Sequence, residues 1–151
     1  CTLFLNYLDW VMQRVFCLIF LFFLLSEVVK AQEDVRIELL LPFDGLTCST
    51  ECYVPIDTST KFLKLRAFSS IEGNKYKISD AEVSLYRKER TINYTLIKSN
   101  NITLNRLGHR EYGDLIIIKI QKVLRANSKN EISTVNRFYP KTITIPVNIS
   151  E

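Results

Sequence analysis

Val15–Leu25 (VFCLIFLFFLL) is an unbroken run of eleven apolar residues near the start of the chain. As a helix this run would extend about 16 Å, against a membrane hydrocarbon core of roughly 30 Å. Arg14 precedes it, and Glu27 and Lys30 follow closely, so a longer spanning helix would have to bury charged side chains. The run therefore has the length and the flanks of the apolar core of a secretory signal peptide.

Residues on either side of the run predict where the signal starts and where it is cut. Met12, the only methionine, opens the sequence Met-Gln-Arg just before the run and is the expected start of translation. Val29 and Ala31 occupy the two positions where signal peptidases require small side chains, which predicts cleavage before Gln32.

These features divide the chain into two predicted parts. Residues 1–31 are upstream sequence followed by a cleaved signal peptide, or else by a membrane anchor formed by an uncleaved Val15–Leu25. Residues 32–151 remain as 120 residues, close to the commonest size of a single domain. The predicted localisation is therefore secreted or otherwise extracytoplasmic, with membrane association through Val15–Leu25 if the run is retained.

The exported part has a small positive charge. It contains 18 basic and 14 acidic residues, a net charge of +4 that equals that of the whole chain, and the two signs are interspersed, as in Arg87–Arg90 (RKER). Nucleic-acid-binding domains gather a higher density of positive charge on one face or in one run. We therefore expect no nucleic-acid partner.

Two cysteines, Cys48 and Cys52, remain after the predicted cut, separated by Ser-Thr-Glu. In an oxidising compartment a local disulfide is the default for such a pair. Free or intermolecular thiols are the first alternative. Redox or metal chemistry is the second, but the only histidine, His109, is some sixty residues away, and a metal site needs further ligands.

Short segments of alternating apolar and polar residues follow the cut. These strand-like segments are Val35–Phe43, Phe62–Phe68, Ala81–Arg87, Thr91–Ile97, Ile102–Leu104, Leu115–Leu124 and Lys141–Ile149, with Val135–Tyr139 as the start of the last hairpin arm. Leu115–Leu124 begins with apolar residues on both faces, which predicts a central strand, and its pattern shifts near Gln121 and Lys122, as at a β-bulge. Pro146 predicts an edge position or an early end for the last strand. The fold class is therefore all-β, with about seven strands.

The strand pattern resembles that of immunoglobulin-like modules in exported and cell-surface proteins. Phe62–Phe68 (FLKLRAF), a Gly-Asn turn and Asp80–Tyr86 (DAEVSLY) resemble the second and third strands of such modules, and Glu111–Ile120 and Lys141–Ile149 resemble the last two. The resemblance implies an antiparallel β-sandwich that serves as a spacer, an adhesion unit or a docking surface. The chain lacks the widely spaced cysteines and core tryptophan of antibody domains, since its only tryptophan is Trp10.

No arrangement of residues predicts catalysis. His109 lies in a glycine-flanked loop, and Glu111 and Asp114 precede a strand, where carboxylates are ordinarily solvated. The sequence contains no Gly-X-Ser-X-Gly elbow, no phosphate-binding loop and no dinucleotide-binding fingerprint. We therefore expect a protein that is not an enzyme and that uses no cofactor and no metal.

Three Asn-X-Ser/Thr triplets satisfy the acceptor rule for N-linked glycosylation. They begin at Asn93, Asn101 and Asn148. Asn101 is the favoured acceptor because it lies in the predicted turn Lys98–Asn101. The alternative is that these residues are simply polar members of strands and turns.

The leading hypothesis is an exported or surface-attached β-sandwich with a structural, adhesion or partner-binding role, whose partner is a protein or a glycan. A second hypothesis is a pilin-like filament subunit that donates Val35–Leu41 to a neighbour by strand pairing. A third is a fragment of a larger membrane-anchored surface protein, and a fourth is a small exported enzyme or inhibitor that uses His109.

Overall fold

The computed structural model describes residues 34–42 and 45–148. The predicted signal peptide or anchor, including Val15–Leu25, lies outside the described residues. Within them, no helix has both the length and the apolar character needed to cross a membrane.

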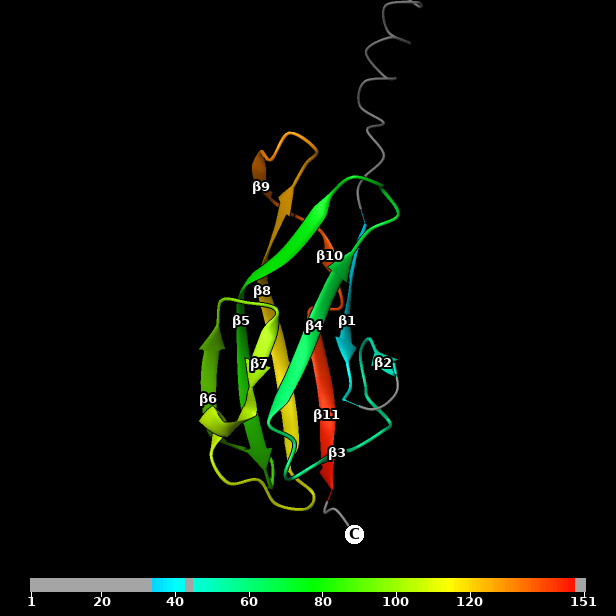
Figure 1. Cartoon of the computed structure of the whole chain (residues 1–151). Helices are drawn as coiled ribbons and strands as arrows, with labels where there is room; N and C mark the ends of the chain where they lie inside the picture. Colours follow the sequence, from blue (N-terminus) through cyan, green and yellow to red (C-terminus); the bar gives the residue numbers. More distant parts are fainter. Residues whose placement is uncertain (1–33, 43–44, 149–151) are drawn as a thin grey trace, which may run out of the picture. The chain divides into compact units, whose positions relative to one another are not determined.

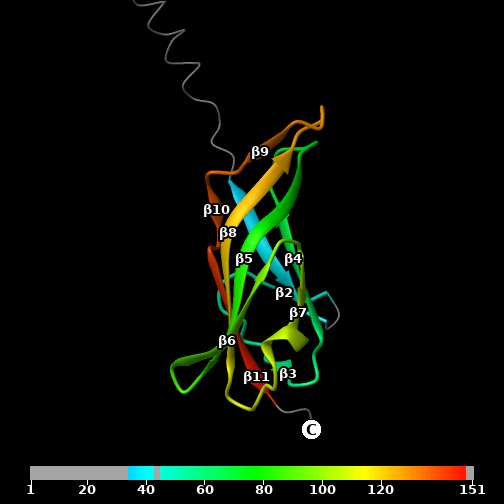
Figure 2. The same cartoon turned by 90° about the vertical axis from the view of Figure 1, so that its left-hand side faces the viewer.

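Residues 34–148 form two β-sheets, whose two layers can be followed in Figures 1 and 2. The five-stranded sheet has the order β10 (Phe138–Tyr139), β1 (Val35–Leu40), β4 (Phe62–Phe68) and β7 (Asn101–Thr103), with β2 (Thr47–Cys48) paired to β1. The six-stranded sheet has the order β3 (Ile56–Asp57), β11 (Thr142–Asn148), β8 (Leu115–Ala126), β5 (Lys75–Arg87) and β6 (Arg90–Ile97), with β9 (Ile132–Thr134) paired to β8.

Alternation along the strands builds one core between the two sheets. Val35, Ile37 and Leu39 of β1 are buried while Arg36 is exposed, as a strand with one face on the core requires. Leu63 and Leu65 of β4 are buried in the same cluster as Ile116, Ile118 and Ile120 of β8 and Ile143 and Ile145 of β11. The prediction of an all-β sandwich is confirmed, but the described residues form eleven strands rather than about seven, because strands of only two or three residues, such as β2, β3 and β10, are too short to show an alternating pattern.

β8 is the central strand of its sheet, as its sequence predicts. It pairs with β5 on one side and with β11 on the other, and Ile116 and Ile118 are fully buried. The register with β5 shifts where Ala81 pairs with Ile120 but Asp80 pairs with Lys122, which leaves Gln121 unpaired. The predicted bulge is therefore present at that position.

Two short parallel pairs depart from the expected antiparallel pattern. β10 pairs with β1, and β3 pairs with the end of β11. The expectation that Val135–Tyr139 starts the last hairpin arm is wrong, because β10 joins the five-stranded sheet and β11 joins the other one. Pro146 lies two residues before the end of β11, whose outer side pairs with the two-residue strand β3 and forms a single bridge to Glu51 at Thr144.

Two local departures from the sequence expectations affect the site described below. β5 begins at Lys75 rather than at Ala81, because its first half pairs with the far end of β8. Leu104 is not the end of a strand but the first residue of a short 3-10 helix, η1 (Leu104–Leu107), which contacts β6.

Candidate binding face

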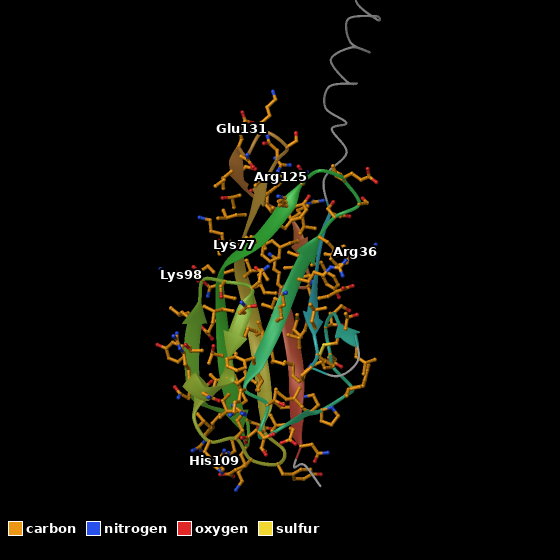
Figure 3. All side chains as sticks on the ribbon, viewed as in Figure 1. Arg36, Lys77, Lys98, His109, Arg125 and Glu131 are labelled. Atoms are coloured by element: carbon orange, nitrogen blue, oxygen red, sulfur yellow. A yellow bond between two sulfur atoms is a disulfide. The ribbon has the colours of Figure 1, made fainter. Side chains whose placement is uncertain are left out.

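His109, Glu111 and Asp114, the residues considered for catalysis, lie in the loop between η1 and β8. His109 is exposed in a loop at the end of the sandwich opposite the β8–β9 hairpin that carries Glu131, as Figure 3 shows. Among the described residues, no group of three or more histidine, cysteine, aspartate or glutamate side chains is placed to hold a metal ion.

Cys48 and Cys52 are brought together at disulfide-bonding distance, with their Cα atoms 5.4 Å apart. Cys48 belongs to β2 and pairs with Leu39, whereas Cys52 is buried against the core. The backbone N–H of Cys52 donates to the carbonyl oxygen of Thr144 at 2.9 Å. The cysteine loop therefore links the five-stranded sheet to β11 of the other sheet.

The amide side chain of Asn93, in the first sequon, is fully engaged. Its Nδ2 donates to the carbonyl oxygens of Leu107 at 3.2 Å and of Arg106 at 3.4 Å, which joins β6 to η1. Its Oδ1 accepts the backbone N–H of Tyr94 at 2.8 Å. The Asn93 side chain therefore satisfies the backbone N–H of Tyr94 on β6, an edge strand of its sheet.

The other two sequons lie at strand ends. Asn101 is exposed, but it is the first residue of β7 and not part of the turn in which the sequence placed it. Asn148 is exposed and is the last residue of β11, and its carbonyl oxygen accepts the N–H of Thr58 at 3.1 Å. The third residue of the Asn148 sequon, Ser150, lies outside the described residues.

Asp114 departs from the expectation that carboxylates before this strand are solvated, because it is only 1% exposed. Arg87 donates from Nε to Oδ1 at 2.8 Å and from Nη2 to Oδ2 at 2.9 Å, and it also pairs with the more exposed Glu111. The hydrogen bond from Arg87 lowers the pKa of Asp114, burial opposes this effect, and the backbone N–H of Glu111 lowers the pKa further. This pair joins β5 to the start of β8.

Arg110 is a second buried charge that sequence reasoning missed. Its guanidinium donates to the carbonyl oxygens of Leu104 at 3.0 Å and of Thr60 at 2.6 Å, and also to that of Thr58. Burial lowers the pKa of Arg110, and the charge of Asp57 opposes this shift. Arg110 therefore links the loop before β4 to η1 through these hydrogen bonds, which is a structural role.

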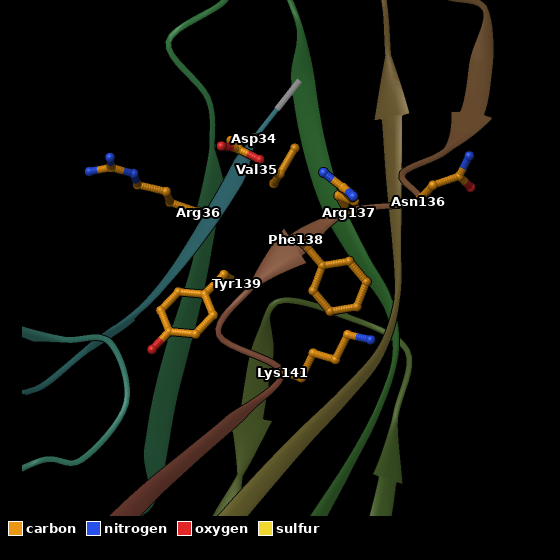
Figure 4. A pocket seen from close by; sticks show the side chains of 8 residues that line it. All are labelled: Asp34, Val35, Arg36, Asn136, Arg137, Phe138, Tyr139 and Lys141. Carbon is orange, nitrogen blue, oxygen red and sulfur yellow. The ribbon is translucent and has the colours of Figure 1, made fainter. Parts of the chain in front are cut away.

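A hollow of about 450 Å³ lies beside the β1–β10 pair. Figure 4 shows Phe138 and Lys141 directed to one side of β10, with Arg36 and Tyr139 on the other side. Its lining contains three basic side chains and the single carboxylate of Asp34, and it contains no histidine or cysteine. The lining therefore offers no acid–base pair.

The outer face of the six-stranded sheet is the most unusual surface of the domain. The residues that make it apolar, called the β6–β11 face below, are Tyr86, Ile92, Tyr94, Leu96, Leu115, Ile117 and Pro146. The sequence correctly places Ile92, Tyr94 and Leu96 on one side of β6, and the structure exposes them by 52%, 61% and 53%.

Strand register aligns this face in rows across the sheet. Tyr86, Leu115 and Pro146 form one row from β5 to β11, because Leu115 pairs with both of the others. Tyr94 pairs with Ser84, whose other neighbour in the register is Ile117. Tyr86, Leu115 and Pro146 therefore form an apolar row across three strands, and Tyr94 and Ile117 extend the apolar face on either side of the buried Ser84.

A third row borders the apolar rows and is charged. In this row Glu82 of β5 pairs with Lys119 of β8, next to Leu96 of β6. The Glu82 carboxylate also accepts the hydroxyl of Ser84 at 2.9 Å. One acidic and one basic side chain thus lie side by side at the edge of the apolar surface.

The outer face of the five-stranded sheet has a different character. Arg36 and Glu38 of β1 lie beside Lys64 and Arg66 of β4, and Arg66 stacks over the ring of Phe68 at 4.9 Å from its centroid. Charged side chains therefore cover the centre of this face, as is usual for a solvated sheet.

Comparisons with protein-family models, curated proteins and solved structures gave no match for this chain.

Proposed function

We propose that this protein is an exported or surface-attached, non-enzymatic module of immunoglobulin-like type, and that its β6–β11 face docks a second copy of the chain. The observation that carries this proposal is the contrast between the two outer faces. A solvated sheet normally alternates buried apolar and exposed polar residues, as Val35–Leu39 of β1 and Leu63–Arg66 of β4 do. Extended exposed apolar surfaces usually mark binding sites.

The order of the strands supports the immunoglobulin-like class. Consecutive strands change sheet seven times along the described chain, including the steps from β4 to β5, from β6 to β7 and from β7 to β8. Such crossings are typical of Greek-key sandwiches, to which immunoglobulin-like modules belong. The export part of the proposal rests on Val15–Leu25 and its flanking residues.

Self-complementarity supports a second copy as the partner. Consider two copies stacked face to face, with a two-fold axis that runs along the strands between β5 and β8. Each residue of β5 then faces its own β8 register partner from the other copy. Glu82 faces Lys119 of the second copy, and Tyr86 faces Leu115. Charged and apolar side chains are therefore both matched across such an interface.

A charge-exchange experiment tests this arrangement. Sedimentation equilibrium of the exported full chain should reveal a dimer. Glu82→Lys and Lys119→Glu should each weaken the dimer about tenfold, because each places like charges in contact. An equimolar mixture of these two variants should associate again. In the mixed dimer the two basic side chains of the Glu82→Lys chain face the two acidic side chains of the Lys119→Glu chain. Like charges remain within each chain, so recovery in the mixture cannot come from repair inside one molecule.

A matched control exists on the opposite face. Glu38 and Arg66 are register partners in the five-stranded sheet, so Glu38→Lys and Arg66→Glu make the same charge changes away from the proposed interface. These variants should associate like the wild type. A wild-type chain that is monomeric at micromolar concentration contradicts the docking proposal, and so does a mixture of Glu82→Lys and Lys119→Glu that associates no better than its components.

The pilin-like hypothesis gains no support from the position of β1. This strand pairs with β4 on one side and with β10 and β2 on the other, and Val35, Ile37 and Leu39 are buried. A donated strand has to be free to enter a neighbouring molecule. We therefore retain the face-to-face arrangement as the proposed mode of association.

A further inference from the structure

We propose that Asn101 carries an N-linked glycan whose first sugar packs against the ring of Phe62. This inference rests on the export that forms part of the proposed function, because N-glycosylation takes place in the secretory pathway. It goes beyond that function by assigning a modification site and a contact that stabilises the fold.

The first argument is the position of the acceptor. Asn101 is exposed at the edge of the five-stranded sheet, on the outer face, since the next residue, Ile102, is fully buried. Asn101 and Thr103, the acceptor and the hydroxyl residue of the sequon, both line an open apolar hollow of about 560 Å³. The glycan attached to Asn101 would therefore begin at the wall of this hollow.

The second argument is an aromatic ring that the fold leaves uncovered. Phe62 is 63% exposed and lines the same hollow, together with Leu40 and Pro42. Phe62 pairs with Thr103 across β4 and β7, and Asn101 pairs with Lys64, so Phe62 and Asn101 are diagonal neighbours on one face. Diagonal neighbours in a sheet are about 7–8 Å apart, within reach of long side chains and of a sugar attached to one of them.

The chemistry of the two partners fits. The apolar C–H face of a pyranose ring packs favourably on an aromatic ring, and burial of the exposed Phe62 removes apolar surface from water. Neither of the other sequons offers this arrangement: Asn93 already uses both ends of its amide, and no aromatic residue pairs with Asn148 in the described strands.

Thermal unfolding of the full chain, expressed in a eukaryotic secretory host, tests the proposal. Intact mass should give a product that begins at Gln32 with a glycan on Asn101. Complete enzymatic removal of glycans should lower the Tm by about 4 °C, and trimming to the first sugar should not lower it. In the Phe62→Thr variant, removal of glycans should leave the Tm unchanged, whereas Phe62→Tyr should retain the wild-type difference.

Two sequon variants provide a matched control. Thr103→Val blocks glycosylation at Asn101 and should abolish the dependence of the Tm on glycans, whereas Thr95→Val blocks only the Asn93 sequon and should preserve it. An exported product with a bare Asn101, or a glycan effect of equal size in Phe62→Thr, overturns the inference while leaving export and docking intact. A chain retained inside the cell with its leader uncut contradicts export, and with it this inference.

Discussion

The guanidinium of Arg87 holds the carboxylate of Asp114 through two parallel hydrogen bonds, 2.8 Å and 2.9 Å long, across 27 positions of sequence. A paired arrangement of this kind fixes the relative position of two groups better than a single contact. It connects the last residue of β5 to the residue before β8, at the end of the sheet where both strands terminate their pairing.

Asp114→Ala should destabilise the domain by about 3 kcal/mol, because it leaves the Nε–H of Arg87 and the backbone N–H of Glu111 without their acceptors. Glu111→Ala is the matched control, since it removes a second carboxylate from the same arginine at a half-exposed position and should cost less than about 1 kcal/mol. Urea unfolding of the two variants measures the difference. Equal losses would contradict a special role for the buried carboxylate.

Stability should fall in acid, and Asp114 should account for part of the loss. The pKa of Asp114 is lowered in the folded protein, so its contribution is present above the unfolded value of about 3.9 and disappears as the pH falls through the folded value. Below about pH 4 the unfolding free energy of the wild type should therefore decline more steeply than that of Asp114→Asn. Parallel curves for the two proteins would show that another group is responsible.

Asn93→Ala should increase aggregation on heating. The substitution releases the backbone N–H of Tyr94 at the edge of β6, where residues 91–97 carry no charge. Light scattering during a thermal ramp measures the effect. Thr95→Val separates the causes, because it removes the same sequon and leaves the Asn93 hydrogen bonds in place. If both variants aggregate alike, loss of a glycan is the cause.

Reduction of the Cys48–Cys52 disulfide should destabilise the domain by about 2 kcal/mol, the value that the loop-closure model gives for so short a loop. A Tm measured with and without a reductant should therefore differ by several degrees. The double variant Cys48→Ala and Cys52→Ala should be insensitive to the reductant. A wild-type Tm that does not change on complete reduction would contradict the prediction.

Local periodicity was sufficient to predict the strands that build the core. β4 and β6 begin or end within one residue of their predicted bounds, because both alternate clearly over their whole length. The first half of β5 could not be predicted in this way. The backbone N–H of Ile78 donates to the Oδ1 of Asn100 at 2.8 Å, and Ile78 pairs with Val123. Both partners are distant in sequence.

The candidate binding face was only half predictable. Alternation puts Ile92, Tyr94 and Leu96 on one side of β6, but the direction in which that side points depends on which residues of β5 and β6 pair. The buried state of Asp114 was not predictable for the same reason, since Arg87 reaches it only through the fold. A charged side chain that the sequence places in a solvated loop can be buried when a residue of opposite charge, distant in sequence, pairs with it in the fold.

The two parallel strand pairs have a mechanical consequence. A tensile load between Asp34 and Asn148 pulls β1 toward its N-terminus, whereas β10 leads directly into β11, which is pulled toward its C-terminus. The β3–β11 pair is loaded in the same sense. In both pairs the hydrogen bonds lie across the direction of force, so a load along the strands shears them together rather than opening them one at a time.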